Sequence, residues 1–279
     1  MIDLHGVDGV VFDMDGTLIH RKRGGGYVTI PGAKKALQAL RRSGRGVFVF
    51  TNAGHIDPAG LSRELAEDGL KVAESEIVTP VVSAISYINE RFAGEPVAVF
   101  ANDLVRGWMR REGVDVVAGP EAEAARVVFV AHPQAFDYEE VEAAARAILS
   151  GATFLTGSNV PGYAGHGHFI FSRGGMMNAA LSKATGRRPT VVGKPSKAAV
   201  RELVRRAGVP SERLAVVGDD VILDIGLGRL GGSLTILVRS GTHGGLDDLA
   251  RRPPLQRPHH VVDSIADLIP AFSSPHDGP

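Results

Sequence analysis

The most informative segment of the sequence is Val7-Asp8-Gly9-Val10-Val11-Phe12-Asp13-Met14-Asp15-Gly16-Thr17. An apolar run of strand length ends here in two carboxylates that are one residue apart. Because strand side chains alternate between faces, Asp13 and Asp15 are expected on one side and Met14 on the other. Gly16 permits the sharp exit that a strand end needs. In α/β proteins this end of a strand carries the binding and catalytic groups.

The two carboxylates raise the question of what balances their charge. Two unit charges about 4 Å apart repel by about 4 kcal/mol at an effective dielectric constant near 20. A bound divalent cation removes this repulsion, and carboxylate oxygens are ligands that hard cations prefer. The pair therefore predicts a hard-metal site at Asp13 and Asp15. A solvated Asp-x-Asp-Gly turn is the alternative that these residues alone leave open.

Composition narrows the class of protein. The 279 residues are 44% hydrophobic, which is enough for a sizeable core and room for two domains. Lys and Arg total 31, as do Asp and Glu, so no global charge recruits nucleic acid or an anionic membrane surface. The absence of cysteine excludes disulfides and thiolate chemistry. No signal peptide or membrane-length apolar run is visible, so we expect a cytoplasmic protein.

Short apolar runs alternate with helical patterns, which predicts βαβ units around a parallel sheet. The fold class is therefore α/β, and the polar end 273–279 is expected to be a disordered tail. The predicted strands are 7–12, 46–50, 96–100, 126–131, 152–156, 190–192, 214–217 and 234–238. The predicted helices are 32–43, 57–69, 80–92, 138–149, 174–185 and 196–207.

Three further motifs follow predicted strands. Thr51 and Asn52 follow 46–50 and offer donors that suit phosphate oxygens, although the same residues form ordinary turns. Lys194, in Gly193-Lys194-Pro195, can neutralise an anion, although most single lysines are solvated. Asp219 and Asp224 form a second acidic pair after 214–217. In a parallel sheet all these strand ends meet at one edge, so the motifs are expected to converge.

This ordered set of motifs resembles the haloacid dehalogenase superfamily of phosphotransferases. Within it, Pro31-Gly32-Ala33, Thr51-Asn52, Gly193-Lys194-Pro195 and the spacing from Gly218-Asp219 to Asp224 look like the class IIA subgroup of NagD-like and 4-nitrophenyl phosphatases. The resemblance implies a Rossmann-like parallel-sheet core, 1–79 plus 189–279, with an inserted α/β cap domain at 80–188. It covers nearly the whole chain. It also implies that the cap can mediate a homodimer.

The resemblance implies a Mg²⁺-dependent phosphatase that hydrolyses a phosphate monoester of a small metabolite. Asp13 would be the nucleophile that forms an aspartyl phosphate, and Asp15 the general acid and base. Asp13, Asp219 and the main-chain carbonyl of Asp15 would hold Mg²⁺, with Asp224 reached through a bound water. By the same resemblance Thr51, Asn52 and Lys194 would bind the transferred phosphate.

Two other functions stay open at this point. A phosphotransferase or phosphomutase would use the same aspartyl phosphate with an acceptor other than water. A non-catalytic phosphometabolite-binding protein would share the site, but it has no need of the nucleophile Asp13 or of the acid Asp15. The substrate itself does not follow from the sequence, because likeness of fold does not fix it.

Three further places carry candidate residues. Asp220 stands where the subgroup usually has Arg, and it could join the metal site. The cap loop carries Asn159, Tyr163 and His166 as candidate specificity residues, while His166 and His168 lack a third metal ligand and form a surface loop or meet the substrate. The basic segment 21–23 lies where the superfamily has a flap, and it is a solvated turn or attracts phosphate.

Overall fold

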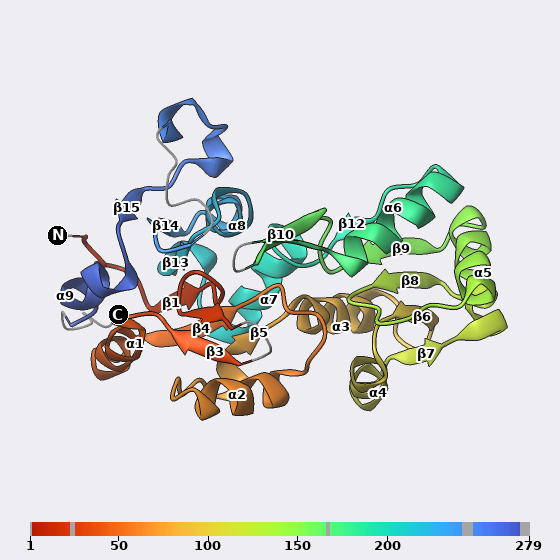
Figure 1. Cartoon of the computed structure of the whole chain (residues 1–279), viewed down its shortest axis with the longest axis horizontal. Helices are drawn as coiled ribbons and strands as arrows, with labels where there is room; N and C mark the ends of the chain where they lie inside the picture. Colours follow the sequence, from red (N-terminus) through yellow and green to blue (C-terminus); the bar gives the residue numbers. More distant parts are fainter. Residues whose placement is uncertain (1, 23–25, 166–167, 242–247, 274–279) are drawn as a thin grey trace. The chain divides into compact units, whose positions relative to one another are not determined.

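The computed structural model describes residues 2–22, 26–165, 168–241 and 248–273, and for residues 163–169 it describes no side chains. The chain forms two compact units. Unit 1 contains Met1–Thr51, Pro58–Val78 and Pro195–Pro279, and unit 2 contains Asn52–Asp57 and Thr79–Lys194. Unit 1 therefore joins the red and orange start of the chain to its blue end, whereas unit 2 is almost entirely one inserted stretch from yellow to green (Figure 1).

Unit 1 is built on a six-stranded parallel sheet in the order β15-β14-β13-β1-β4-β5. The chain leaves β1 toward β4 on one side and later returns to β13 on the other, so β1 is the topological switch point. The strands are β1 Gly9–Phe12, β4 Gly46–Phe50, β5 Ile77–Val78, β13 Leu214–Gly218, β14 Leu234–Val238 and β15 His260–Val262. A separate antiparallel hairpin pairs β2 Ile19–Arg21 with β3 Tyr27–Thr29.

Helices cover this sheet because each presents an apolar face. In α1, Ala36, Leu37 and Leu40 are buried at helical spacing, and α1 packs against α9. Ser196 caps α7 by accepting a hydrogen bond from the backbone of Ala199, and α7 packs against α8. The helices are α1 Ala33–Arg42, α2 Pro58–Glu67, α7 Lys197–Ala207, α8 Gly226–Gly231 and α9 Ile269–Phe272. Short 3₁₀ segments are Glu74–Glu76, Ser211–Arg213, Leu249–Arg251, Pro254–Gln256 and Ile265–Leu268.

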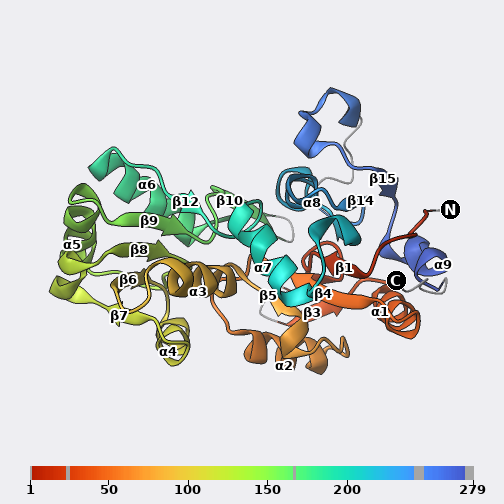
Figure 2. The ribbon, with the colours of Figure 1, turned by 180° about the vertical axis from the view of Figure 1, so that it is seen from behind.

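Unit 2 has its own five-stranded parallel sheet in the order β12-β9-β8-β6-β7. Its strands are β6 Pro96–Phe100, β7 Asp115–Val117, β8 Val127–Val130, β9 Thr153–Thr156 and β12 Thr190–Val191. An antiparallel hairpin joins β10 Gly162–Gly165 to β11 His168–Phe171. The helices are α3 Pro80–Arg91, α4 Asp103–Arg111, α5 Tyr138–Leu149 and α6 Arg173–Thr185, with a 3₁₀ segment at Gly119–Ala124 (Figure 2). Residues of α5 and α6 share one hydrophobic core with the sheet, and this core consists mainly of alanine, larger aliphatic and phenylalanine side chains.

The predicted α/β fold is confirmed, and every predicted strand and helix is present to within about two residues. The unpredicted strands β2, β3, β5, β7, β10, β11 and β15 have four residues or fewer, too few to show a period. Unit 2 extends past the predicted boundary at residue 188 to Lys194, because β12 pairs with β9 in the sheet of unit 2. Residues 274–279 of the predicted tail lie outside the described residues. Within the described part of the chain, every helix is too short or too polar to cross a membrane.

His259 ties β15 to β14 in unit 1. Its backbone N–H donates to the carbonyl of Thr235 at 3.0 Å, and its Nδ1 lies 2.8 Å from the Thr235 hydroxyl. Its Nε2 meets Nη1 of Arg229. Burial of the ring, the charge of Arg229 and the neighbouring His260 lower the pKa of His259. The fold therefore favours the neutral imidazole.

Stability should consequently fall in acid. The folded-state pKa of His259 is below its unfolded value near 6.5. The unfolded chain therefore binds the proton first, and the contribution of the neutral ring is lost as the pH falls through the folded pKa. We expect the thermal midpoint of H259Q to fall less between pH 7 and pH 5 than that of the wild type. Equal slopes for both proteins in scanning calorimetry would contradict this assignment.

Candidate active site

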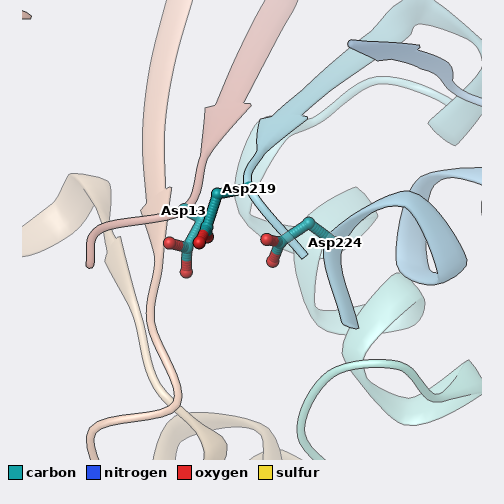
Figure 3. Close-up of side chains that lie close together, drawn as sticks. All are labelled: Asp13, Asp219 and Asp224. Atoms are coloured by element: carbon teal, nitrogen blue, oxygen red, sulfur yellow. The ribbon is translucent and has the colours of Figure 1, made fainter. Parts of the chain in front are cut away.

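Three carboxylates converge at the carboxyl end of the unit 1 sheet. Asp13 follows β1 and Asp219 follows β13, and the two strands pair in parallel with Phe12 opposite Val217. Asp224 lies on the single π-helical turn Val221–Ile225 that follows β13. Each residue offers a carboxylate oxygen, and these atoms all lie within 4.8 Å of one another. Figure 3 shows the side chains of Asp13 and Asp219 beside each other, with the carboxylate of Asp224 directed toward them.

The burial of this cluster makes its charge costly. Asp219 and Asp224 are only 3% and 1% exposed, and Asp13 is half-buried. One oxygen of Asp224 accepts a hydrogen bond from the backbone N–H of Asp220 at 3.0 Å. Buried carboxylates need a counter-charge or coordination to a metal. Three converging oxygens of this kind form a donor set that fits a hard divalent cation such as Mg²⁺.

Glycines make room for the carboxylates. Gly16 has a positive φ of 86°, and a Cβ built on it would lie 2.7 Å from Oδ2 of Asp219. A Cβ on Gly241 would overlap the same carboxylate, and one on Gly218 would overlap the side chain of Asp224. Gly16 and Gly218 belong to the sequence motifs described above, whereas Gly241 lies outside them. The signal that could have found it is its place just beyond the end of β14, another strand of the same sheet.

Ser240 links the same loop to the segment that follows β1. Its hydroxyl donates to the carbonyl of Gly16 at 2.7 Å. The strand ends of β1, β13 and β14 therefore meet around the Asp219 carboxylate, as the strand order requires. Like Gly241, Ser240 was absent from the sequence-based site.

Asp15 lies apart from the three-carboxylate group in the described chain. Its two oxygens instead accept hydrogen bonds from Arg21 on β2, at 2.7 Å from Nε and 3.1 Å from Nη2. Of the basic segment 21–23, Lys22 pairs with Asp68 at 3.2 Å, and Arg23 is outside the described residues. Arg21 thus contacts Asp15, a predicted catalytic residue. Neither a solvated turn nor a segment that attracts phosphate predicts this contact.

Asp220 has a structural use. Its Oδ1 accepts hydrogen bonds from the backbone N–H groups of Ile222 and Leu223 at 2.7 and 3.0 Å. It is therefore the N-cap of the turn that carries Asp224. Among the described carboxylates, the group of three includes Asp219 and Asp224 but not Asp220.

The predicted phosphate-binding residues divide between the two units. Thr51 belongs to unit 1, is 1% exposed, and donates its backbone N–H to Val78 at 3.2 Å. Asn52 and Lys194 belong to unit 2, where Oδ1 of Asn52 accepts from the backbone N–H of Lys194 at 3.4 Å. Lys194 is 3% exposed. The buried Nδ2 of Asn52 has no hydrogen-bond partner among the described residues, so this donor can serve a ligand.

The candidate specificity residues are only partly described. Asn159 follows β9 and is exposed, and its Oδ1 accepts from Nδ2 of Asn178 at 3.2 Å. Asn178 is buried, and the same nitrogen also contacts Thr156 and the carbonyl of Ser158. Tyr163 lies on β10, but its side chain is outside the described part, as are His166 and the side chain of His168.

Comparisons with known proteins agree with this arrangement. A model of haloacid dehalogenase-like hydrolases matches residues 10–115, and a related HAD-hydrolase-like model matches residues 191–268. A dihydroxyacetone phosphatase from Corynebacterium glutamicum is 31% identical over 94% of this chain and 91% of its own length. The ribonucleotide monophosphatase NagD from Escherichia coli is 26% identical over 94% of this chain and 98% of its own. The solved p-nitrophenyl phosphatase from Archaeoglobus fulgidus superposes with a TM-score of 0.83 at 26% identity, covering 95% and 99% of the two chains.

The chain therefore belongs to the haloacid dehalogenase-like hydrolases, in their class IIA subgroup of NagD-like and 4-nitrophenyl phosphatase-like proteins. The resemblance seen in its motifs is confirmed. It is an enzyme, and its class is that of the phosphoric monoester hydrolases.

The glycine packing predicts a large effect from a single methyl group. In G218A the new Cβ would overlap the side chain of Asp224, so the turn that carries this residue must shift. Overpacking of this kind costs about 1–3 kcal/mol of unfolding free energy. G107A is the matched control, because its Cβ would make only an ordinary contact, 3.7 Å from Nη1 of Arg111. Denaturant unfolding should separate the two variants, and a G218A variant as stable as wild type would refute the packing argument.

Proposed function

We propose that the protein hydrolyses the phosphate monoester of a small metabolite through an aspartyl phosphate on Asp13, with Mg²⁺ as cofactor. The observation that carries this proposal is the convergence of Asp13, Asp219 and Asp224 at the switch point of the unit 1 sheet. The relatives support it, since those compared above are named as phosphatases of small phosphorylated compounds. The motif order supports it as well, because each proposed group follows a strand.

The carboxylates of Asp13 and Asp219, with the main-chain carbonyl of Asp15, would hold the Mg²⁺, and Asp224 would reach it through a bound water. When bound, the cation supplies positive charge that balances the buried carboxylates and the phosphate of the substrate. The close ligand oxygens and the burial of two of the three side chains favour this role.

The reaction is carried by two aspartates in two steps. An oxygen of Asp13 attacks the phosphorus, and the bond from phosphorus to the substrate oxygen breaks with its electron pair on that oxygen. Asp15 donates a proton to the leaving alkoxide. In the second step Asp15 takes a proton from water, whose oxygen attacks the phosphorus and restores the carboxylate of Asp13. One residue serves both proton transfers because the second reverses the first.

Thr51, Asn52 and Lys194 would hold the oxygens of the transferred phosphate. Phosphoryl transfer depends mostly on positioning and on charge stabilisation, which a hydroxyl, an amide and an ammonium provide. The buried Nδ2 of Asn52, for which the described residues offer no hydrogen-bond partner, supports this assignment. The hydrogen bond from the backbone of Lys194 to Asn52 holds these two motifs to each other within unit 2.

Unit 2 would act as the cap that selects the substrate and excludes water. Asn159 is the described residue proposed to read the substrate, and its contact with buried Asn178 fixes the direction of its amide. Tyr163 and His166 remain proposals from the sequence. Because the relatives include a dihydroxyacetone phosphatase and a glycerol-3-phosphate phosphatase, triose and glycerol phosphates are the first substrates to test.

We also propose where the enzyme is located and with what it associates. A cytoplasmic location, a homodimer through the cap, and the absence of nucleic-acid and membrane partners follow from the sequence reasoning and the family resemblance. Size-exclusion chromatography with light scattering tests the dimer directly.

The first test is phosphate release from a panel of phosphorylated metabolites. We expect Mg²⁺-dependent turnover of at least one compound by the wild type, and a fall of at least about 10³-fold in D13N, because the amide cannot act as the nucleophile. Activity retained in D13N would rule out the mechanism. Phosphate transferred to an added sugar instead of water would identify a phosphotransferase, and binding without turnover would identify a sensor.

The cation site has a test that needs no substrate. Mg²⁺ at about 100 times its dissociation constant should stabilise the wild type by about 2.7 kcal/mol. D219N should lose most of this gain, because one buried ligand is missing. D248N is the control, since Asp248 is exposed and pairs with Arg251 in the same unit. If the thermal shift of D219N with Mg²⁺ equals that of the wild type, Asp219 is not a ligand.

A further inference from the structure

Arg21 makes the contact that most directly affects the chemistry of Asp15. Both oxygens of the Asp15 carboxylate accept from one guanidinium, at 2.7 Å from Nε and 3.1 Å from Nη2. This fork geometry fixes the plane of the carboxylate as well as its distance. The Asp15 side chain is 41% exposed, and no other hydrogen bond to its carboxylate is found among the described residues, so the arginine is what sets its direction.

The arginine is itself held in place. Arg21 and Tyr27 lie opposite each other in the β2–β3 ladder, and the guanidinium carbon lies 5.5 Å from the centre of the Tyr27 ring. A guanidinium over an aromatic face is attracted to it. Tyr27 is 4% exposed and donates its hydroxyl to Oε2 of Glu64 on α2 at 2.7 Å. Burial and this hydrogen bond raise the pKa of Tyr27, so its hydroxyl keeps the proton that it donates.

The hairpin that carries Arg21 is tied to unit 1 by Asp68, just beyond α2. Asp68 accepts from the backbone N–H of Tyr27 at 2.8 Å and from Lys22 at 3.2 Å, and its carbonyl accepts from the hydroxyl of Thr29 at 3.2 Å. The hydrogen bond from Tyr27, followed by that from Lys22, lowers the pKa of Asp68. The hairpin that carries Arg21 is therefore held at β3 and at Lys22, the residue that directly follows β2.

We propose that Arg21 is a positioning residue, which holds the Asp15 carboxylate in the direction needed for proton transfer to and from the reacting oxygens. The inference rests on the proposed function, in which Asp15 is the general acid and base. Proton transfer is sensitive to such alignment, because an error of about 1 Å in placement can cost about 100-fold in rate.

The two chemical steps depend differently on this alignment. With 4-nitrophenyl phosphate the leaving phenolate is stable without a proton, so formation of the aspartyl phosphate does not need Asp15. Hydrolysis does need it: the water oxygen bonds to phosphorus, its proton passes to Asp15, and the bond from phosphorus to Asp13 breaks with its electrons on Asp13. The products are inorganic phosphate, the Asp13 carboxylate and protonated Asp15. Loss of Arg21 should therefore slow the second step and let the phosphoenzyme accumulate.

The test compares R21M with the wild type on 4-nitrophenyl phosphate in the presence of Mg²⁺. We expect kcat to fall about 10- to 100-fold. The fraction of enzyme trapped as aspartyl phosphate in quenched samples should rise, and a burst of 4-nitrophenolate close to one equivalent should precede steady turnover. R21K should recover part of the rate only, since an ammonium cannot make the two-pronged contact. D15N serves as the reference for a blocked second step.

R41M is the matched control. Arg41 also grips one carboxylate with two nitrogens, at 3.3 and 2.7 Å from Glu76, in the same unit and with similar exposure, 36% against 37% for Arg21. Its loss should leave kcat and phosphoenzyme unchanged. If R21M turns over like R41M, or loses kcat without accumulating phosphoenzyme at an unchanged melting temperature, the positioning role is refuted. A wild type that shows no turnover of any phosphate ester would instead refute the proposed function.

Discussion

The fold holds together three carboxylates that repel one another, and the structure around the site depends on this constraint. Asp13, Asp219 and Asp224 come from three segments, and each is placed by backbone hydrogen bonds made elsewhere: the sheet ladder for the first two and the capped π-turn for the third. The folding free energy of the whole sheet therefore opposes the repulsion. A bound cation would relieve it, and metal binding at these carboxylates would then stabilise unit 1.

The same constraint bears on two further acidic residues beside the site, Asp220 and Asp15. Asp220 uses its carboxylate to cap the turn, and its backbone N–H to hold Asp224. Asp15 pairs with Arg21, which balances its charge and fixes the direction of its carboxylate. Asp15 and Asp220 therefore lie within two residues of Asp13 and Asp219 in the sequence without joining the group of three carboxylates. The arrangement of the site therefore depends on the partners of Asp15 and Asp220 as well as on the three carboxylates of the group.

The sequence predicted the parts of this arrangement that follow from strand geometry. Asp13 and Asp219 could be paired in advance because parallel strands share one edge, whatever the loops do. The contact between Arg21 and Asp15 could not, because it depends on a hairpin of two three-residue strands that shows no period. The N-cap role of Asp220 could have been predicted, because an Asp just before a helical turn is an N-cap signal. Its position directly after Asp219 favoured a metal-binding interpretation instead. The placement of residues 189–194 was missed because the two-residue strand β12 gives no sign of which sheet it joins.

The glycines around the carboxylates have a consequence for how this family can change. A Cβ at Gly16 or Gly241 would overlap the carboxylate of Asp219, and a Cβ at Gly218 would overlap the side chain of Asp224, so each glycine leaves room for the aspartate that it faces. Replacing a carboxylate by its amide alters charge but hardly alters volume, so the packing does not resist it. A variant that keeps the packing but lacks one carboxylate charge therefore lies one isosteric substitution away, whereas a side chain at any of these three glycines would have to displace an aspartate. The packing around the carboxylates therefore restricts the volume of the side chains at these positions more strictly than it restricts their charge.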